Sequence, residues 1–136
     1  MKRENTQAAI NDFAKGTTDA RYLRFFEFFN QQLFYEAHEV LEALWLPQRH
    51  GPDGAFYKGL IQLAGAFVHW RKGHPNPALA LLSLAKANLE KYGSLHHRLD
   101  IPTTLSFIDE WRRKIETASL GTLFGDQNPS LRLSPG

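Results

Sequence analysis

Residues 34–45 read FYEAHEVLEALW, and this stretch decides the fold class. Its apolar residues recur every three or four positions, which is the spacing of one face of an α-helix. We therefore predict a helix over residues 32–46, and we expect Pro47 to end it, because a proline lacks the amide hydrogen that continues the helix. On a helical wheel, the stripe expected in the core consists of Leu33, Ala37, Val40, Leu41 and Leu44.

Further helices are predicted on both sides of this stretch. Residues 55–72 form the most regular amphipathic segment, and the short turn after it predicts an antiparallel neighbour. In that turn we expect Asn76 to cap the next helix and Pro77 to occupy its first position. No strand pattern is found, so we predict an all-α fold, a compact bundle of five to six helices built around a central antiparallel hairpin at residues 55–92. The predicted helices span residues 5–15, 19–30, 32–46, 55–72, 77–92 and 103–117.

The length of 136 residues suits one domain with one core. We expect an N-terminal polar segment at residues 1–18, a helical domain at 19–117 and an irregular C-terminal tail at 118–136. The chain has no cysteine, and its polar start lacks the apolar run of an export signal, so we predict a cytoplasmic location. A membrane partner is not expected, because no stretch approaches the roughly 20 apolar residues of a membrane-spanning helix.

The charge pattern gives little support for a nucleic-acid partner. The net charge is only +2, and the chain carries 14 acidic residues. We interpret the basic run at residues 112–114 as the solvated face of a helix. The four phenylalanines within residues 25–29 cover more of their helix than one buried stripe needs. We expect either the C-terminal tail or a second subunit to cover this surplus, and the second case predicts a homo-oligomer.

Polar residues gather on the two best-defined helices. His38 and Glu42 are four residues apart, so both side chains can reach the same point. On the helix at residues 55–72, a second polar stripe consists of Lys58, Gln62, Gly65 and His69. A glycine inside a helix costs about 1 kcal/mol relative to alanine, so we expect another backbone or a ligand to approach Gly65 closely.

The first functional hypothesis is a ligand- or metal-binding site, with hydrolysis as its activity. The sequence His38-Glu39-x-x-Glu42 is similar to the H-E-x-x-H pattern of zinc hydrolases, with Glu39 in the position of the catalytic general base. His38 and Glu42 would hold a divalent metal ion of zinc- or iron-like preference. A third metal ligand would come from Glu36 or His69. The predicted ligand-binding residues, of which the last two would orient a small molecule, are Glu36, His38, Glu42, Gln62 and His69.

Two other interpretations use the same residues. One is a small-molecule pocket without a metal. The other is a non-enzymatic, dimeric scaffold in which these side chains form a buried hydrogen-bond network. Because an unpaired buried polar group costs about 1–3 kcal/mol, the network predicts a hydrogen bond from the first polar helix to Gln62 or His69. His96 and His97 are interpreted as a loop pair that follows a helix end.

The motif FYEAHEVLEALW, followed by GLIQLA and a later histidine, resembles a family of small bacterial and archaeal proteins called domain of unknown function 309. The resemblance covers residues 20–115 and implies an all-helical fold, but it implies no established activity. The chain departs from the family pattern in the turn between its central helices, where His74 and Pro77 replace an asparagine and a glycine. The matching positions are Phe34, Glu36, His38, Glu39, Leu41, Glu42, Trp45, Gly59, Leu60, Ile61, Gln62, Ala64 and His69.

Overall fold

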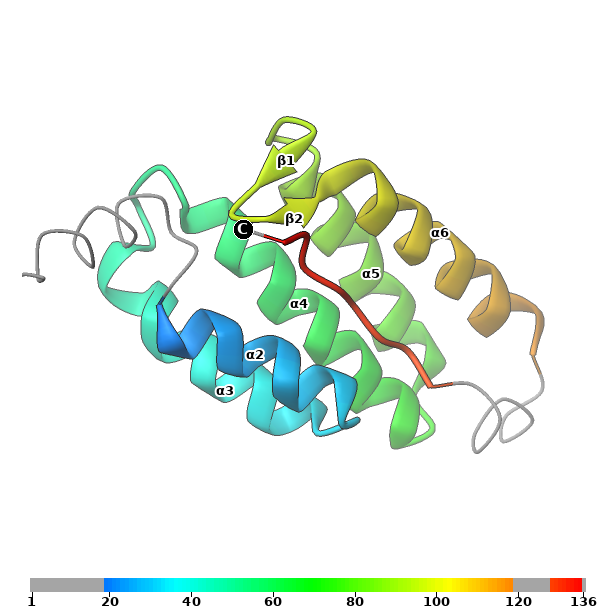
Figure 1. Ribbon diagram of the computed structural model, residues 1–136. Helices are drawn as coiled ribbons and strands as arrows, with labels where there is room; N and C mark the ends of the chain where they lie inside the picture. Colours follow the sequence, from blue (N-terminus) through cyan, green and yellow to red (C-terminus); the bar gives the residue numbers. More distant parts are fainter. Residues whose placement is uncertain (1–18, 119–127, 136) are drawn as a thin grey trace, which may run out of the picture.

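The computed structural model describes residues 19–118 and 128–135, and its architecture is an all-α bundle, as predicted (Figure 1). The predicted helix at residues 5–15 lies outside the described residues. Two-residue strands β1 (Leu95–His96) and β2 (Leu99–Asp100) pair before the last helix, and a 3-10 helix η1 (Leu46–Gln48) extends the motif helix. The α-helices are α2 (Ala20–Asn30), α3 (Phe34–Trp45), α4 (Gly54–Arg71), α5 (Pro75–Leu89) and α6 (Ile101–Thr117).

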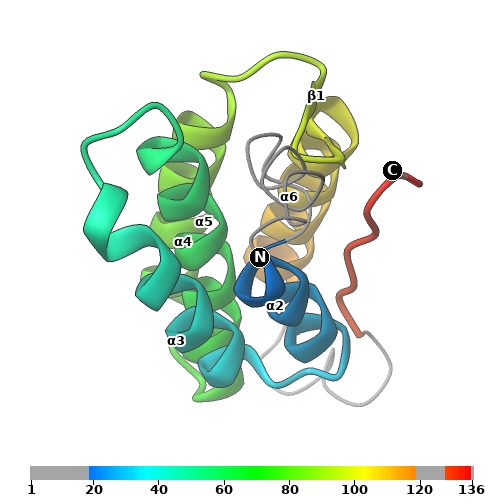
Figure 2. The same cartoon turned by 60° about the vertical axis from the view of Figure 1, so that its left-hand side comes forward.

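Helix α4 lies at the centre of the bundle. It contacts α3 on one side and α5 on the other, and α4 and α5 form the predicted antiparallel hairpin (Figures 1 and 2). Eleven of the 18 residues of α4 are buried, because two of its faces are covered. Helix α4 packs tightly on α5 at Gly59, where an added Cβ atom would lie 3.0 Å from Cγ of Leu89. The lack of a side chain at this glycine is what allows the two helices to approach.

An aromatic cluster connects the outer helices to α4. The ring centroid of Phe67 lies 5.7 Å from that of Phe29, 5.2 Å from Phe34 and 5.2 Å from Trp111. These partners belong to α2, α3 and α6, so one side chain of α4 ties three helices together. Burial of apolar side chains is the dominant favourable term in folding, and large rings contribute strongly to it.

The extended segment at residues 128–135 packs on α2 and on the β1–β2 turn. Asn30 at the end of α2 exchanges two hydrogen bonds of 2.7 Å with the backbone of Leu131. Arg98 in the turn donates a hydrogen bond to the carbonyl of Ser134 and accepts one from its amide. Three of the four clustered phenylalanines of α2 are buried inside this chain, and the fourth, Phe28, is half-buried. The tail thus takes part in covering α2.

Several sequence-based boundaries need correction. Helix α5 begins at Pro75 with His74 as its cap, not at Pro77 with Asn76 as its cap, and it ends at Leu89. Both prolines are compatible with the first turn, because amide hydrogens there have no partner within the helix. Helix α3 spans Phe34–Trp45 rather than residues 32–46. Pro47 follows the end of α3, but it lies within the 3-10 helix η1.

The prediction that the chain contains no strand was wrong, although the sheet is small. Strands β1 and β2 are joined by His97 and Arg98, whose φ angles are 46° and 65°. Two-residue hairpin turns with positive φ normally carry asparagine or glycine, so this sequence lacks the usual hairpin signal. Within the predicted core stripe of α3, Ala37, Leu41 and Leu44 are buried, whereas Leu33 is exposed and Val40 is half-buried. None of the described helices has the length and apolar character that crossing a membrane requires.

Candidate functional site

The predicted polar residues of α3 lie on its accessible surface. Nε2 of His38 is 3.9 Å from a carboxylate oxygen of Glu42, which is longer than a hydrogen bond. The side chain of His38 is 29% exposed and that of Glu42 is 46% exposed. Tyr35 is hydrogen-bonded to the Glu39 carboxylate, and this bond raises the pKa of Tyr35. Glu36 and Glu39 are exposed. The accessible surface of α3 therefore carries one imidazole and three carboxylates, with Glu36 and His38 on different sides of the helix.

The polar stripe of α4 divides between its two neighbouring helices. Lys58 lies over the Trp45 ring of α3, with Nζ 4.6 Å from the ring centroid. Gln62 instead faces α5, where its side-chain oxygen accepts a hydrogen bond of 2.8 Å from Asn88. His69 returns to the α3 side, where it lines the same pocket as His38. Gln62 is thus not part of a common site with the α3 residues.

The pocket between α3 and α4 has a volume of about 190 Å³ and is lined by Tyr35, His38, Gly65, Val68 and His69. An added Cβ atom at Gly65 would meet only Cδ1 of Leu81, at an ordinary 3.5 Å. The close helix contact therefore lies at Gly59, and Gly65 leaves space in an open pocket. A neighbouring pocket of about 220 Å³ shares Tyr35 and Val68 and extends to Arg71 and Lys72. We call the two pockets together the α3–α4 groove.

Two histidines of the groove have an unsatisfied ring nitrogen. Nδ1 of His38 and Nδ1 of His69 are buried and have no hydrogen-bond partner. Within the described residues, no hydrogen bond joins a polar side chain of α3 to Gln62 or His69, so the predicted interhelical network is not observed. An orphaned buried nitrogen is uncommon in a purely structural site. The arrangement instead suits a site that is completed by a ligand.

A second polar cluster was missed by the sequence analysis. Asp53, directly before α4, contacts two imidazoles that lie more than 40 positions later in the chain. Nε2 of His96 lies 2.8 Å from one carboxylate oxygen, and Nε2 of His97 lies 2.9 Å from the other. In the part of the chain that the structure describes, these three residues form the group whose ligand atoms come within 4.8 Å of one another. His38 and Glu42 are not part of such a three-residue group.

The environment of Asp53 favours its charged form. Partial burial is the largest single influence and raises the pKa of this carboxyl group. The hydrogen bonds from His97 and His96, together with the charge interactions of both rings, act in the opposite direction and outweigh burial, so the pKa of Asp53 lies below its usual value. The carboxylate is therefore available as an anionic ligand at neutral pH.

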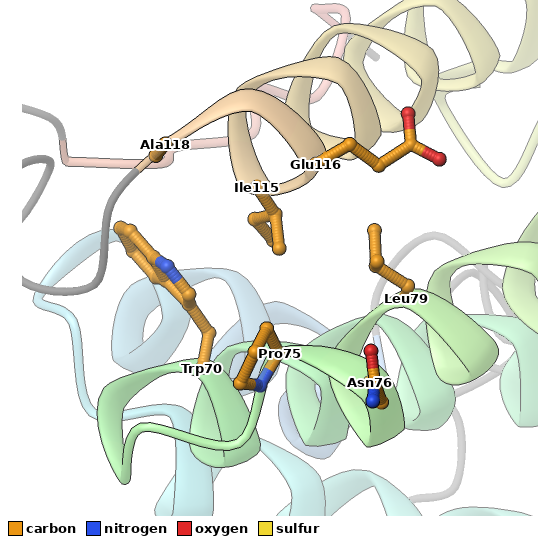
Figure 3. Close-up of a pocket in the computed structure, with 7 residues that line it drawn as sticks. All are labelled: Trp70, Pro75, Asn76, Leu79, Ile115, Glu116 and Ala118. Carbon is orange, nitrogen blue, oxygen red and sulfur yellow. The ribbon is translucent and has the colours of Figure 1, made fainter.

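A pocket of about 420 Å³ lies between the α4–α5 turn and the end of α6 (Figure 3). Its lining includes the apolar side chains of Trp70, Leu79 and Ile115. Glu116 is the ionisable residue of this lining, and Figure 3 shows its carboxylate pointing away from Trp70 and Pro75. The pocket lacks a set of converging polar groups, so it is a weaker candidate than the two clusters above.

One protein family matches a segment that contains α3 and α4. Residues 22–81 match the family described as Domain of unknown function (DUF309). The resemblance that the sequence indicated is thereby confirmed. No curated protein and no solved structure matches the chain. The DUF309 match includes the whole α3–α4 groove and Asp53, but it ends before His96 and His97.

Proposed function

We propose that the chain binds a divalent metal ion together with a small polar ligand in the α3–α4 groove. In this proposal His38 and Glu42 hold the ion, and His69 approaches from the opposite helix. The observation that carries it is that His38 and His69 line one pocket from two helices, and each has a buried ring nitrogen without a partner. A bound polar ligand would give both nitrogens the partner that buried polar atoms normally have.

The distance between the first two groups supports metal binding. Zinc lies about 2.0–2.1 Å from a histidine nitrogen and about 2.0–2.2 Å from a carboxylate oxygen. The 3.9 Å separation of Nε2 of His38 from a Glu42 carboxylate oxygen is therefore close to the span of one ion that bridges them. The buried Nδ1 atoms of His38 and His69 are left for the small polar ligand. Both side chains are partly exposed, so small rotations can shorten the distance. Imidazole and carboxylate groups suit zinc-like and iron-like divalent ions.

The remaining residues have separate roles in the proposal. Glu36 or His69 supplies a third ligand, and the open positions of the ion accept the small molecule. In a hydrolytic form of the proposal, Glu39 is the general base that activates water on the ion. Gln62 is assigned no direct contact, since it is bonded to Asn88, and it instead fixes α4 against α5.

The alternative function is a non-enzymatic scaffold in which the same side chains are structural. It predicts that His38→Ala lowers stability and leaves metal binding unchanged. The proposed metal site predicts instead that His38→Ala weakens metal binding and leaves stability unchanged. The homo-oligomer, the cytoplasmic location and the absence of a nucleic-acid partner stay predictions under both functions.

The test is calorimetric titration of Zn²⁺ into untagged protein, with elemental analysis and thermal melts of each variant. We expect His38→Ala and Glu42→Gln each to weaken one zinc site at least about tenfold, because loss of a ligand should cost no less than loss of a supporting residue. His50→Ala is the matched control, since His50 is exposed and lines neither cluster. Unchanged zinc affinity in both ligand variants, with reduced melting temperatures, would overturn the proposal and favour the scaffold.

A further inference from the structure

The cluster of Asp53, His96 and His97 is built from two segments that the fold brings together. Asp53 ends the loop before α4, and the histidines lie at the β1–β2 hairpin. Figure 1 shows this hairpin beside the N-terminal end of α4. The side chains of Asp53 and His96 are each 26% exposed, and that of His97 is 9% exposed. The cluster is therefore half-buried and open on one side.

The backbone of the hairpin explains how two adjacent histidines reach one carboxylate. Neighbouring side chains of an extended strand point to opposite faces. At His97 the φ angle of 46° interrupts this alternation, and its imidazole turns to the same side as that of His96. The two ring centroids are 4.2 Å apart. A positive φ is uncommon for a residue with a side chain, and such conformations gather at functional sites.

The side chain of Asp53 contacts these imidazoles and does not cap α4. It occupies the N-cap position of α4, where an aspartate usually accepts a hydrogen bond from a backbone amide of the first turn. Here its side chain makes no capping bond. The amide of Phe56 donates instead to the hydroxyl of Tyr92, at 2.9 Å. The carboxylate is thus directed towards the histidines while another residue caps the helix.

Aromatic residues hold the cluster in position. The hydroxyl of Tyr92 also donates to the carbonyl of Pro52, at 2.8 Å, which fixes the loop next to Asp53. The hydroxyl of Tyr22, on α2, donates to the backbone carbonyl of His97, at 2.7 Å. The His96 ring lies 4.6 Å from the ring of Phe56 and 4.5 Å from that of Tyr92. These contacts limit the rotation of both imidazoles and preorganise them.

We infer that Asp53, His96 and His97 form a metal centre for a divalent transition metal such as Zn²⁺ or Fe²⁺, separate from the α3–α4 groove. Two imidazoles and one carboxylate are the protein ligands of many catalytic zinc and non-haem iron sites, which leave coordination positions open. The three ligand atoms already lie within 4.8 Å of one another. Ligands on a tetrahedral ion with bonds of about 2.1 Å lie roughly 3.4 Å apart, so side-chain shifts of about 1 Å complete the site.

Binding replaces the hydrogen bonds of the cluster by coordination bonds. Each Nε2 that donates a hydrogen bond to Asp53 must give up its proton before its lone pair can bind the ion, and in a neutral imidazole that proton moves to Nδ1. A ligating imidazole must be neutral, so binding weakens as the pH falls and the histidines become protonated. The exposed side of His96 and Asp53 leaves room for water or a small ligand on the ion. This centre does not depend on the α3–α4 groove, because it shares no residue with it.

The test uses Co²⁺ and Zn²⁺ with the full chain. Co²⁺ reports its coordination through visible absorption, and Zn²⁺ competition then gives the affinity. We expect His96→Ala to weaken this site at least about tenfold, with circular dichroism unchanged. Asp53→Asn is the second variant, since it preserves the shape of the side chain while removing its charge. His50→Ala is again the control, and His38→Ala leaves this site intact.

The outcomes separate this inference from the proposed function. Loss of one Co²⁺ equivalent and of its share of the visible absorption in His96→Ala and Asp53→Asn, but not in His38→Ala, supports the centre. A second Co²⁺ equivalent that depends on His38 belongs to the α3–α4 groove. A spectrum that disappears only in His38→Ala overturns it and leaves the α3–α4 groove as the metal site. Wild-type protein without Co²⁺ absorption or competing zinc affinity also overturns it. In that case the cluster is a hydrogen-bonded link between the hairpin and α4.

Discussion

Replacing Tyr92 by phenylalanine tests how the start of α4 is held. The hydroxyl accepts a hydrogen bond from the amide of Phe56 and donates one to the carbonyl of Pro52. The aromatic ring also contacts Phe56 and His96, at centroid distances of 5.5 Å and 4.5 Å. Phenylalanine keeps these ring contacts and removes only the two hydrogen bonds. The substitution therefore isolates the contribution of the hydroxyl group.

The expected loss of stability follows from the surroundings of the two partners. Pro52 is exposed, so its carbonyl can bond to water in the variant. Phe56 is buried, and its amide lies in the first turn of α4, where no carbonyl of the same helix is available. Two hydrogen bonds contribute about 0.5–1.5 kcal/mol each, or about 1–3 kcal/mol together, and the orphaned amide keeps the loss above the low end of that sum. We expect Tyr92→Phe to lower the free energy of unfolding by about 2 kcal/mol.

The measurement is urea unfolding followed by circular dichroism, with thermal melts beside it. A loss of about 2 kcal/mol corresponds to a fall in melting temperature of about 8 °C for a domain of this size. Tyr35→Phe is the matched control, because Tyr35 is exposed and bonds only to Glu39 on its own helix. We expect that control to change stability by less than about 0.5 kcal/mol. Equal stabilities of Tyr92→Phe and wild type would refute the idea that this hydroxyl caps α4.

Three further predictions concern other contacts of the bundle. Gly65→Ala should raise the free energy of unfolding by about 0.5–1 kcal/mol in urea titration, because alanine favours the helix and its methyl group would meet its nearest atom at 3.5 Å. Gly59→Ala should lose this gain, because its methyl group would lie only 3.0 Å from the Leu89 side chain. Lys86→Met should cost less than about 1 kcal/mol by the same assay, since the ion pair with Asp109 that joins α5 to α6 is partly exposed. Asp53→Asn should be less stable than wild type above about pH 4, because the pKa of the Asp53 carboxyl group is lower in the folded state. Thermal melts at decreasing pH should show the difference shrinking as acid protonates this group in the wild type.

Local periodicity was enough to predict most of the fold. The apolar residues of α3 and of α4 recur at helical spacing, so the sequence alone predicts that both segments are helices. Helix boundaries were harder, because Pro75 and Pro77 both suit a first turn and the sequence cannot choose between them. The β1–β2 hairpin was missed for a different reason. Its turn uses His97 and Arg98 at positive φ, which is a conformation that the rest of the fold imposes.

The two candidate sites differ in how far the sequence can indicate them. His38 and Glu42 are four residues apart on one helix, so their proximity is a property of the helix itself. Asp53 and His96 are 2.8 Å apart only because α4, α5 and the hairpin place them so. Adjacent histidines and an aspartate before a helix were the available signals, and neither reveals such a contact by itself. The orientation of Gln62 was equally hidden, since its partner Asn88 lies on α5.

The position of the two sites along α4 determines how they can work. Asp53 precedes the first residue of α4, and His69 lies near the last. A helix rises about 1.5 Å per residue, so these two side chains are separated by about 24 Å along the helix axis. One small ligand cannot bridge that distance, and two metal ions of a single reaction centre lie only about 4 Å apart. The α3–α4 groove and the Asp53 cluster must therefore bind their ligands independently. Substitutions in one should leave the affinity of the other unchanged, which is why variants at His38 and His96 can be interpreted separately.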